Sequence, residues 1–205
     1  CRQTVYKYIE NGDLWPLTNK ELRYKSDQKR TYNRVKAAKA PRGDSIEHRP
    51  EHINNREEPG HWEMDSLESG KGFKRTWLML TERKTRREII VPMRDKTSES
   101  VVRALNGIER KLGALFPRIF VTITCDNGTE FADAEGIESK RRGKGKRTTV
   151  YYCHPYRPSE RGSNENQNGL IRRHLPKGTD LSTISYEETK RIEDWPVSYT
   201  HLRAH

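Results

Sequence analysis

The stretch from Thr122 to Phe131 constrains the fold most, because a predicted strand ends there at a carboxylate. It reads Thr-Ile-Thr-Cys-Asp-Asn-Gly-Thr-Glu-Phe, and its first residues alternate as a β-strand does before a turn-forming string. An Asp at the exit of a buried strand projects its side chain over the sheet edge, where ligands of α/β sheets usually lie. Asp-Asn-Gly is also a common turn, so Asp126 taken alone fits an ordinary strand-to-turn junction better.

Two further segments offer carboxylates on predicted regular elements. One is His61-Trp62-Glu63-Met64-Asp65 on a strand, and the other runs from Glu160 to Asn168 on a helix. A polar stripe with a carboxylate among cations and amides indicates a negatively charged, metal-bound partner, although a solvated face with local ion pairs is the alternative. The stripe shares one helical face because its members are four, three and four residues apart: Arg161, Glu165, Asn168 and Arg172.

The hydrophobic period predicts an α/β domain. Strands are expected over 61–67, 75–83 and 88–93, and period-two alternation returns over 119–125 and 148–153. Between them the spacing becomes helical, with Thr97 or Ser98 as N-cap and Gly113 at the end. A second helix is expected after Pro158, and the charged run 132–147 is expected to be mobile. The inward positions of the two helices are Val101, Ala104, Leu105, Ile108, Leu112, Leu170, Ile171 and Leu175.

The first 56 residues read differently from the rest. Residues 2–9 predict a short helix like that of a helix-turn-helix module, and residues 1–56 carry 13 Lys or Arg against 7 Asp or Glu. We therefore expect a partial helix-turn-helix remnant over 1–19, a basic linker over 20–56 and a catalytic core over 57–195. Residues 196–205 do not continue the pattern and are expected to be a non-native tail, which leaves the core truncated.

Composition indicates the class of partner. The net charge is +11 and the sequence pI is near 9.6, which favours a polyanion, with nucleic acid the first choice. No apolar run reaches membrane-spanning length, and no signal peptide is visible. We expect a cytoplasmic protein whose three cysteines are reduced, since Cys1, Cys125 and Cys153 form no Cys-x-x-Cys pair.

Metal chemistry explains why separate acids recur in a basic chain. Exchange of a DNA phosphodiester needs an activated nucleophile, a stabilised leaving oxygen and screening of the phosphate, all of which two Mg²⁺ ions supply. Mg²⁺ takes oxygen ligands and keeps several waters, so about three carboxylates from separate elements suffice. Lys and Arg side chains bind the DNA backbone but do not replace these ions.

Several strings in order resemble the IS30 family of bacterial DDE transposases, over about residues 2 to 195. They are Gly60-His61-Trp62-Glu63-Met64-Asp65, Leu80-Thr81-Glu82-Arg83-Lys84-Thr85-Arg86, Cys125-Asp126-Asn127-Gly128-Thr129-Glu130-Phe131, the run Arg161 to Leu170, and Pro176-Lys177-Gly178-Thr179-Asp180. The resemblance implies a ribonuclease H-like, integrase-type core with a mixed five-stranded sheet flanked by helices. Asp126 and Glu165 are separated by 38 intervening residues, a spacing longer than is usual for the family, and 138–147 is the expected insertion.

The resemblance also implies the site and its partners. Asp65, Asp126 and Glu165 match the acidic triad, which would hold Mg²⁺ or Mn²⁺, two ions in all; Glu63, Glu130 and Glu160 are rivals. The expected reaction frees a 3′ hydroxyl at the element's terminal inverted repeats and joins it to target DNA. A homodimer or higher oligomer at the bacterial nucleoid is implied. The expected DNA contacts are Arg161, Asn164, Asn168, Arg172, Arg173 and Lys177, with Arg2, Gln3, Thr4 and Lys7 at the N-terminus.

Two other functions remain open on the sequence. A catalytically inactive DNA-binding fragment or regulator would bind DNA without Mg²⁺ and without the three acids. A ribonuclease H-type or Holliday-junction nuclease would share the acids but lack the helix-turn-helix remnant.

Overall fold

The computed structural model describes residues 2–18, 43–154 and 158–202, and the chain divides into two units, residues 1–38 and 39–205. In the first unit, α1 (Arg2–Asn11) forms the predicted short helix, with Ile9 buried and Thr4 and Lys7 exposed. None of the helices in the described ranges is long and apolar enough to cross a membrane.

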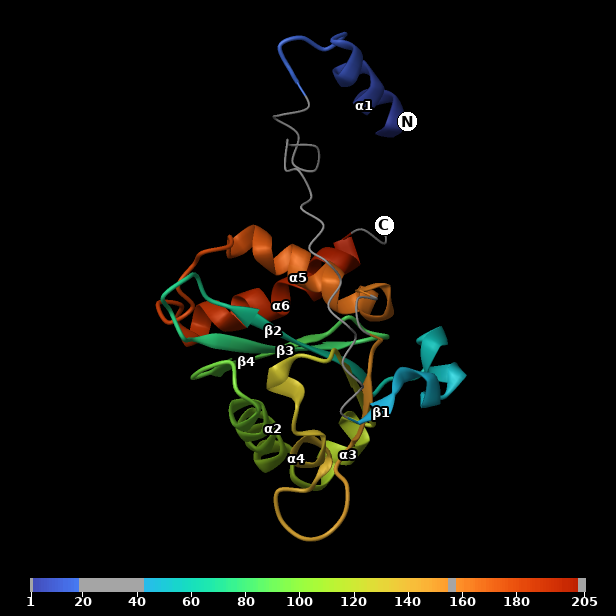
Figure 1. The fold of residues 1–205 in the computed structure, drawn as a ribbon, viewed down its shortest axis with the longest axis vertical. Helices are drawn as coiled ribbons and strands as arrows, with labels where there is room; N and C mark the ends of the chain where they lie inside the picture. The colour runs from blue at the N-terminus through green and yellow to red at the C-terminus, as the bar shows by residue number, and fades with distance from the viewer. Residues whose placement is uncertain (1, 19–42, 155–157, 203–205) are drawn as a thin grey trace. The chain divides into compact units, whose positions relative to one another are not determined.

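The second unit is built on one mixed sheet with the strand order β1-β6-β5-β2-β3-β4 (Figure 1). The meander β2-β3-β4 is antiparallel, whereas β2, β5, β6 and β1 run parallel to one another. The strands are β1 (Asp44–Ser45), β2 (His61–Glu68), β3 (Thr76–Glu82), β4 (Glu88–Met93), β5 (Thr122–Cys125) and β6 (Thr149–Tyr152). Since β2 and β5 are parallel neighbours, residues at the ends of both strands meet at one edge of the sheet.

Helices cover both faces of this sheet (Figure 1). On one face lie α2 (Ser98–Leu112), α3 (Phe116–Ile119) and α4 (Ala134–Glu138). On the other face lie α5 (Gly162–His174) and α6 (Tyr186–Leu202). Single-turn 3₁₀ helices complete the unit: η1 (Ile46–His48), η2 (Glu51–Asn55), η3 (Gly113–Leu115), η4 (Thr129–Phe131) and η5 (Pro158–Arg161).

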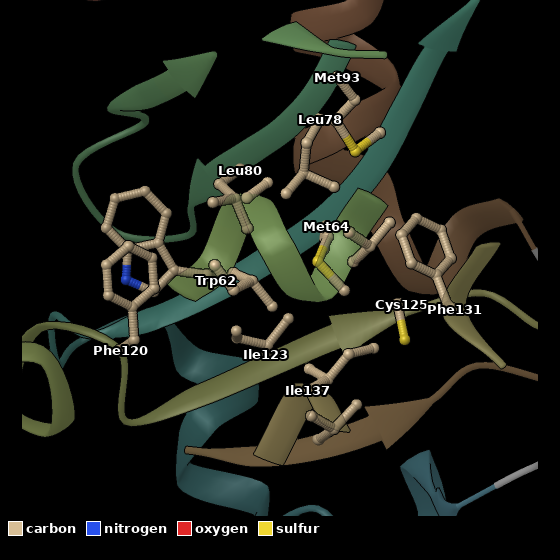
Figure 2. Packing of buried hydrophobic residues seen from close by; sticks show 14 of the residues in the cluster. Trp62, Met64, Leu78, Leu80, Met93, Phe120, Ile123, Cys125, Phe131 and Ile137 are labelled. Atoms are coloured by element: carbon tan, nitrogen blue, oxygen red, sulfur yellow. The ribbon is translucent and has the colours of Figure 1, made fainter. Parts of the chain in front are cut away.

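The alternation of β2 divides the core into two clusters. Trp62 and Met64 pack on the α2 side with residues such as Leu80, Phe120 and Ile123 (Figure 2). Leu67 points to the other side, where a second cluster includes Ile171 of α5 and Ile192 of α6. This is the division that the period-two pattern predicts.

Most predicted elements are confirmed. The helix α2 begins after Thr97, whose hydroxyl accepts the Ser100 N–H, and it ends at Gly113. The helix after Pro158 is α5, in which Leu170 and Ile171 are buried. The order of three strands, a helix, two strands and a helix is as expected, and so is the α/β fold class. Cys125 and Cys153 are buried free thiols, as predicted.

Three local predictions need correction. The strand before Asp126 begins at Thr122, because residues 116–119 form α3 with a proline in its first turn. The sheet has a sixth strand, β1, which lies within the segment predicted as a linker and pairs with β6. The charged run is not wholly mobile, since the Arg147 guanidinium is buried and bonds to Ile137 O, Gly136 O and Asn106.

Candidate active site

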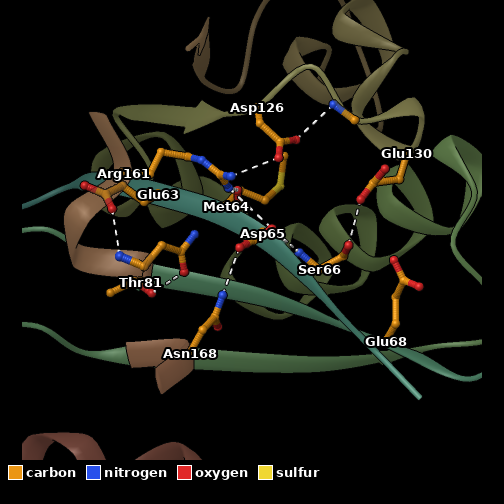
Figure 3. A network of polar contacts seen from close by, with 12 residues as sticks. Glu63, Met64, Asp65, Ser66, Glu68, Thr81, Asp126, Glu130, Arg161 and Asn168 are labelled. Atoms are coloured by element: carbon orange, nitrogen blue, oxygen red, sulfur yellow. Dashed lines mark hydrogen bonds and ion pairs between the residues drawn. The ribbon is translucent and has the colours of Figure 1, made fainter. Parts of the chain in front are cut away.

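Asp65 and Asp126 approach each other because of the register between β2 and β5. The last paired residues of these parallel strands are Glu63 and Thr124, so the residues two positions further on each strand lie level. Both carboxylates contact one guanidinium: Arg161 lies 3.3 Å from Asp65 Oδ1 and donates to Asp126 Oδ2 at 2.8 Å (Figure 3). Two acids that share one cation stand close enough to share another.

Each acid is also oriented by a neutral donor. Asp65 Oδ2 accepts a 2.8 Å hydrogen bond from Asn168 Nδ2, and its Oδ1 accepts the Ser66 N–H (Figure 3). Asp126 Oδ1 accepts the N–H of Gly128 at 2.9 Å. These bonds fix the carboxylate planes, so the acids need little rearrangement to bind a cation.

Burial and charge act against each other in this pair. Burial raises the pKa of Asp65, and the positive charge of Arg161 opposes that rise. Although burial disfavours the charged guanidinium, Asp65 and Asp126 raise the pKa of Arg161 above its ordinary value. The ionised form of Asp65 is therefore favoured by a nearby cation, and Arg161 provides one.

Glu63, the rival of Asp65, is engaged inside the protein. Its side chain is fully buried, Oε1 pairs with Arg83 Nη1 at 2.8 Å, and Oε2 accepts the Asn164 N–H at 2.9 Å. Asn164 lies in the first turn of α5, so Glu63 accepts one of the unpaired N–H groups at the start of that helix. Glu63 holds α5 against the sheet and has no free oxygen for the site.

Glu165 lies in α5, between Arg161 and Asn168 along the chain. Both of those residues contact Asp65, so the backbone of Glu165 lies in the helical turn that faces the two aspartates. Its side chain falls outside the described part of the structure. The structure therefore brings Asp65 and Asp126 together directly and brings Glu165 near them by its place on α5.

A second layer of polar residues flanks Asp65 and was not foreseen. Glu130, a rival for the triad, is buried, and its Oε1 accepts a 2.7 Å bond from Ser66 Oγ (Figure 3). The same oxygen lies 3.2 Å from Lys96 Nζ. A Cβ added to Gly128 would lie 2.5 Å from Glu130 Oε2 and 2.9 Å from Asp126 Oδ1, so both oxygens crowd this glycine. The string Asp-Asn-Gly-Thr-Glu contained the signal, because it places a glycine between two acids whose carboxylates lie close to it. Glu160, the third rival, pairs instead with His154 at 2.8 Å.

The predicted DNA contacts are placed unevenly. Arg173 and Lys177 are exposed, and Arg172 donates to Glu68 O at 3.1 Å. Asn168 and Arg161 are bound to the acids. Asn164 is buried, with Oδ1 accepting from Thr81, and this burial argues against DNA contact there. In the first unit Thr4 and Lys7 are exposed, whereas the side chains of Arg2 and Gln3 lie outside the described ones.

The amino-acid sequence is similar to those of several curated proteins. The chain is 42% identical over 150 residues to the transposase for insertion sequence element IS1086 of Cupriavidus metallidurans, covering 73% of this chain and 42% of that protein. It is 35% identical over 199 residues to the probable transposase for insertion-like sequence element IS1161 of Streptococcus salivarius, covering 95% and 54%. It is 37% identical over 147 residues to transposase InsI for insertion sequence element IS30A of Escherichia coli, covering 71% and 36%.

The chain is homologous to transposases of the IS30 family. This relationship confirms the resemblance that the sequence motifs indicate. The chain spans about half the length, or less, of these IS30-type relatives.

No model of a protein family matches this sequence. The simian T-cell lymphotropic virus intasome in complex with PP2A regulatory subunit B56 gamma is similar with a TM-score of 0.49 and 18% identity, over 80% of this chain and 54% of that one. The catalytic core domain of BIV integrase is similar with a TM-score of 0.41 and 15% identity, over 58% and 70%.

Proposed function

We propose that this chain contains the catalytic core of an insertion-sequence transposase, which cleaves DNA strands and transfers them to a target. The observation that carries the proposal is the convergence of Asp65 and Asp126, from two strands, on one cation. The IS30-type relatives support it, since their names describe transposases. The proposed reaction is hydrolysis that frees a 3′ hydroxyl, followed by attack of that hydroxyl on a target phosphodiester, which releases a new 3′ hydroxyl.

The residues present fit divalent metal ions of the Mg²⁺ or Mn²⁺ type. The fit rests on two preoriented carboxylates that already share a positively charged group, and on the hard oxygen donors that such ions prefer. Asp65 and Asp126 would hold one ion, and Glu165 of α5 would complete a second position. When bound, such ions supply charge that stabilises the attacking and leaving oxygens and screens the phosphate.

The chain's own side chains prepare this site. Asn168 orients the Asp65 carboxylate, and the Gly128 N–H orients that of Asp126. Arg161 holds the two acids together. If a metal ion replaced it there, its guanidinium would be free to bind a DNA phosphate beside them. Arg172, Arg173 and Lys177 follow on the same helix and in the segment after it, where they would contact the strand backbone.

DNA is the proposed partner, and the element ends and a target are the proposed substrates. The net charge of +11 supports a polyanion, and phosphate contacts would supply most of the affinity. Pairing of two element ends requires at least two copies of the site, so we propose a dimer or higher assembly at the nucleoid.

A strand-cleavage assay on supercoiled plasmid tests the proposal, because relaxation of the plasmid reports a single cut at any sequence. With Mg²⁺ or Mn²⁺, Asp126→Asn should lower cleavage at least about 100-fold, the upper range for loss of even an outer-sphere metal partner. Glu135→Gln, which removes one exposed charge in α4, serves as the matched control and should cleave like the parent. Equal cleavage by Asp126→Asn and the parent would refute the metal-binding role of Asp126.

A binding measurement accompanies the assay. Mn²⁺ should raise the melting temperature of the parent and of Glu135→Gln, since a ligand that binds only the folded state stabilises it. The same Mn²⁺ concentration should stabilise Asp126→Asn less than the parent. Stabilisation of all three proteins to the same extent would place the ion elsewhere.

A further inference from the structure

Two histidines and a glutamate gather at the amino end of β2, away from the two aspartates. His52 lies in η2, Glu58 follows it, and His61 is the first residue of β2. One ligand atom from each side chain lies within 4.8 Å of the other two. Asp65 is four residues further along the strand, roughly 13 Å away at the usual rise per residue, so these residues belong to a separate site.

His61 is held in the orientation that a metal ligand needs. Its ring is buried, and Nδ1 forms a 2.8 Å hydrogen bond with Thr122 Oγ1 on the neighbouring strand β5. With Nδ1 bonded to this hydroxyl, Nε2 is the nitrogen left for a ligand. A partner on the second ring nitrogen is the usual way in which proteins fix a metal-binding histidine.

His52 and Glu58 approach His61 from the loop that precedes the strand. His52 Nε2 lies 3.9 Å from Glu58 Oε2, and the His52 and His61 rings stand edge to face with centroids 6.2 Å apart. Gly60, at φ +102°, makes the turn that returns the chain to the sheet, and a Cβ there would meet Val121 at 2.8 Å. Its N–H donates to Glu82 Oε1, which fixes the end of the loop.

We propose that His52, Glu58 and His61 bind a single divalent transition-metal ion, for which Zn²⁺ is the best chemical match. Two imidazoles and a carboxylate are a donor set that suits zinc, whereas Mg²⁺ prefers oxygen ligands alone. Zinc bonds of about 2.0–2.1 Å put ligand atoms roughly 3.3 Å apart, so His52 and Glu58 need to move by only about an ångström. Both side chains are exposed and have room to do so.

The ion would tie the segment before β2 to the centre of the sheet. That segment already contacts the sheet through Arg49, which donates to Thr124 of β5 at 3.0 Å. A metal bond between η2 and β2 would add a second attachment beside it. Three protein ligands leave a fourth position, which a water molecule fills.

Co²⁺ titration of the full chain, after removal of metals with a chelator, tests this proposal. Tetrahedral Co²⁺ absorbs visible light, so the parent should give a band that saturates at one equivalent and disappears when Zn²⁺ is added. His52→Ala and Glu58→Gln should each weaken Co²⁺ binding at least tenfold. Both side chains are exposed, so these variants should keep the parent's circular dichroism spectrum.

Matched controls separate the site from other metal-binding groups. His48→Ala and Glu57→Gln change exposed residues of the same segment and should bind Co²⁺ like the parent. Asp126→Asn should give the same tetrahedral Co²⁺ band as the parent, so this test and the cleavage assay fail independently. The proposal is overturned if millimolar Co²⁺ gives no band with the parent, or if His52→Ala and Glu58→Gln bind as tightly as the parent.

Discussion

Glu88 is a carboxylic acid that the fold keeps protonated. Burial raises its pKa to about 8, the hydrogen bond from Thr81 opposes the rise, and the nearby Glu193 carboxylate adds to it. The geometry agrees, because Thr81 Oγ1 lies 2.6 Å from Glu88 Oε2 and 2.9 Å from Asn164 Oδ1. One hydroxyl has a single proton for these two oxygens, so a protonated Glu88 can donate to Thr81, which then donates to Asn164.

Stability should therefore fall as the pH rises through this region. An acid whose folded pKa lies above its unfolded value of 4.5 binds more protons when folded between 4.5 and about 8. The unfolding free energy then drops by up to about 1.4 kcal/mol for each pH unit in that window and changes no further above it. Glu88→Gln cannot ionise, so it should match the parent below the unfolded pKa of 4.5 and exceed it near the folded value of about 8 in urea denaturation. Glu135→Gln, an exposed change, should follow the parent, and parallel curves for Glu88→Gln and the parent would contradict a protonated Glu88.

At the scale of elements, the attachment of α5 to the sheet sets where the helix places its side chains in the site. Glu63 of β2 accepts the Asn164 N–H at the start of α5 and pairs with Arg83 beyond the end of β3. The same helix carries Glu165 and Asn168. The position of the third acid thus depends on a buried ion pair that does not itself face the site.

Glu63→Gln should destabilise the protein by about 3–5 kcal/mol, because Arg83 would remain buried without a counter-charge. The double variant Glu63→Gln/Arg83→Met should recover much of that loss, since it removes the unpaired cation as well. Urea denaturation of the four members of this cycle measures the coupling. Glu57→Gln, an exposed change, should cost less than about 0.5 kcal/mol. A loss as small for Glu63→Gln would show that the pair does not hold α5.

The elements that the sequence predicts correctly are those with long, regular periods. The apolar positions of α2 repeat over four turns and its caps are explicit, so even its ends are predicted. The start of β5 was missed because Phe116 and Ile119 also suit a strand, and Pro117 favours a helix start as well as a break. The two residues of β1 have no period, and their pairing with β6 depends on the tertiary fold.

The site was predictable in its acids but not in their partners. Asp65 and Asp126 follow from strand ends and motif strings, because each belongs to a local pattern. The contacts of Arg161, Glu63 and Glu130 with other elements join residues 20 to 101 positions apart, and no local pattern encodes them. Burial also separates residues that spacing groups together, as for Asn164 and Asn168 on α5.

For the molecule as a whole, folding makes the surface more basic than the composition suggests. Among the described residues, five glutamates are buried but only two arginines are: Glu63, Glu82, Glu88, Glu130 and Glu193, against Arg83 and Arg147. Among the described residues, burial therefore removes more acidic than basic groups from the surface. A polyanion such as DNA would therefore meet mainly the exposed basic groups, because these glutamates lie inside the fold.

The position of the cationic side chains should affect DNA binding more than their number does. Arg173 and Lys177 lie on and after α5, on the side of the sheet that carries the site, whereas Arg110 and Lys111 end α2 on the opposite face. Arg173→Gln/Lys177→Gln and Arg110→Gln/Lys111→Gln remove equal charge from exposed positions. If DNA lies along α5, the first pair should weaken binding and lower the slope of log affinity against log salt by up to about 1.8, near 0.9 for each phosphate contact. The second pair should leave the slope close to the parent's, because distant charge steers DNA without contacting it.

Fluorescence anisotropy of a labelled duplex from 50 to 200 mM salt, roughly the range over which such slopes are read, measures both slopes. Equal slopes for the two variants would mean that DNA does not follow α5.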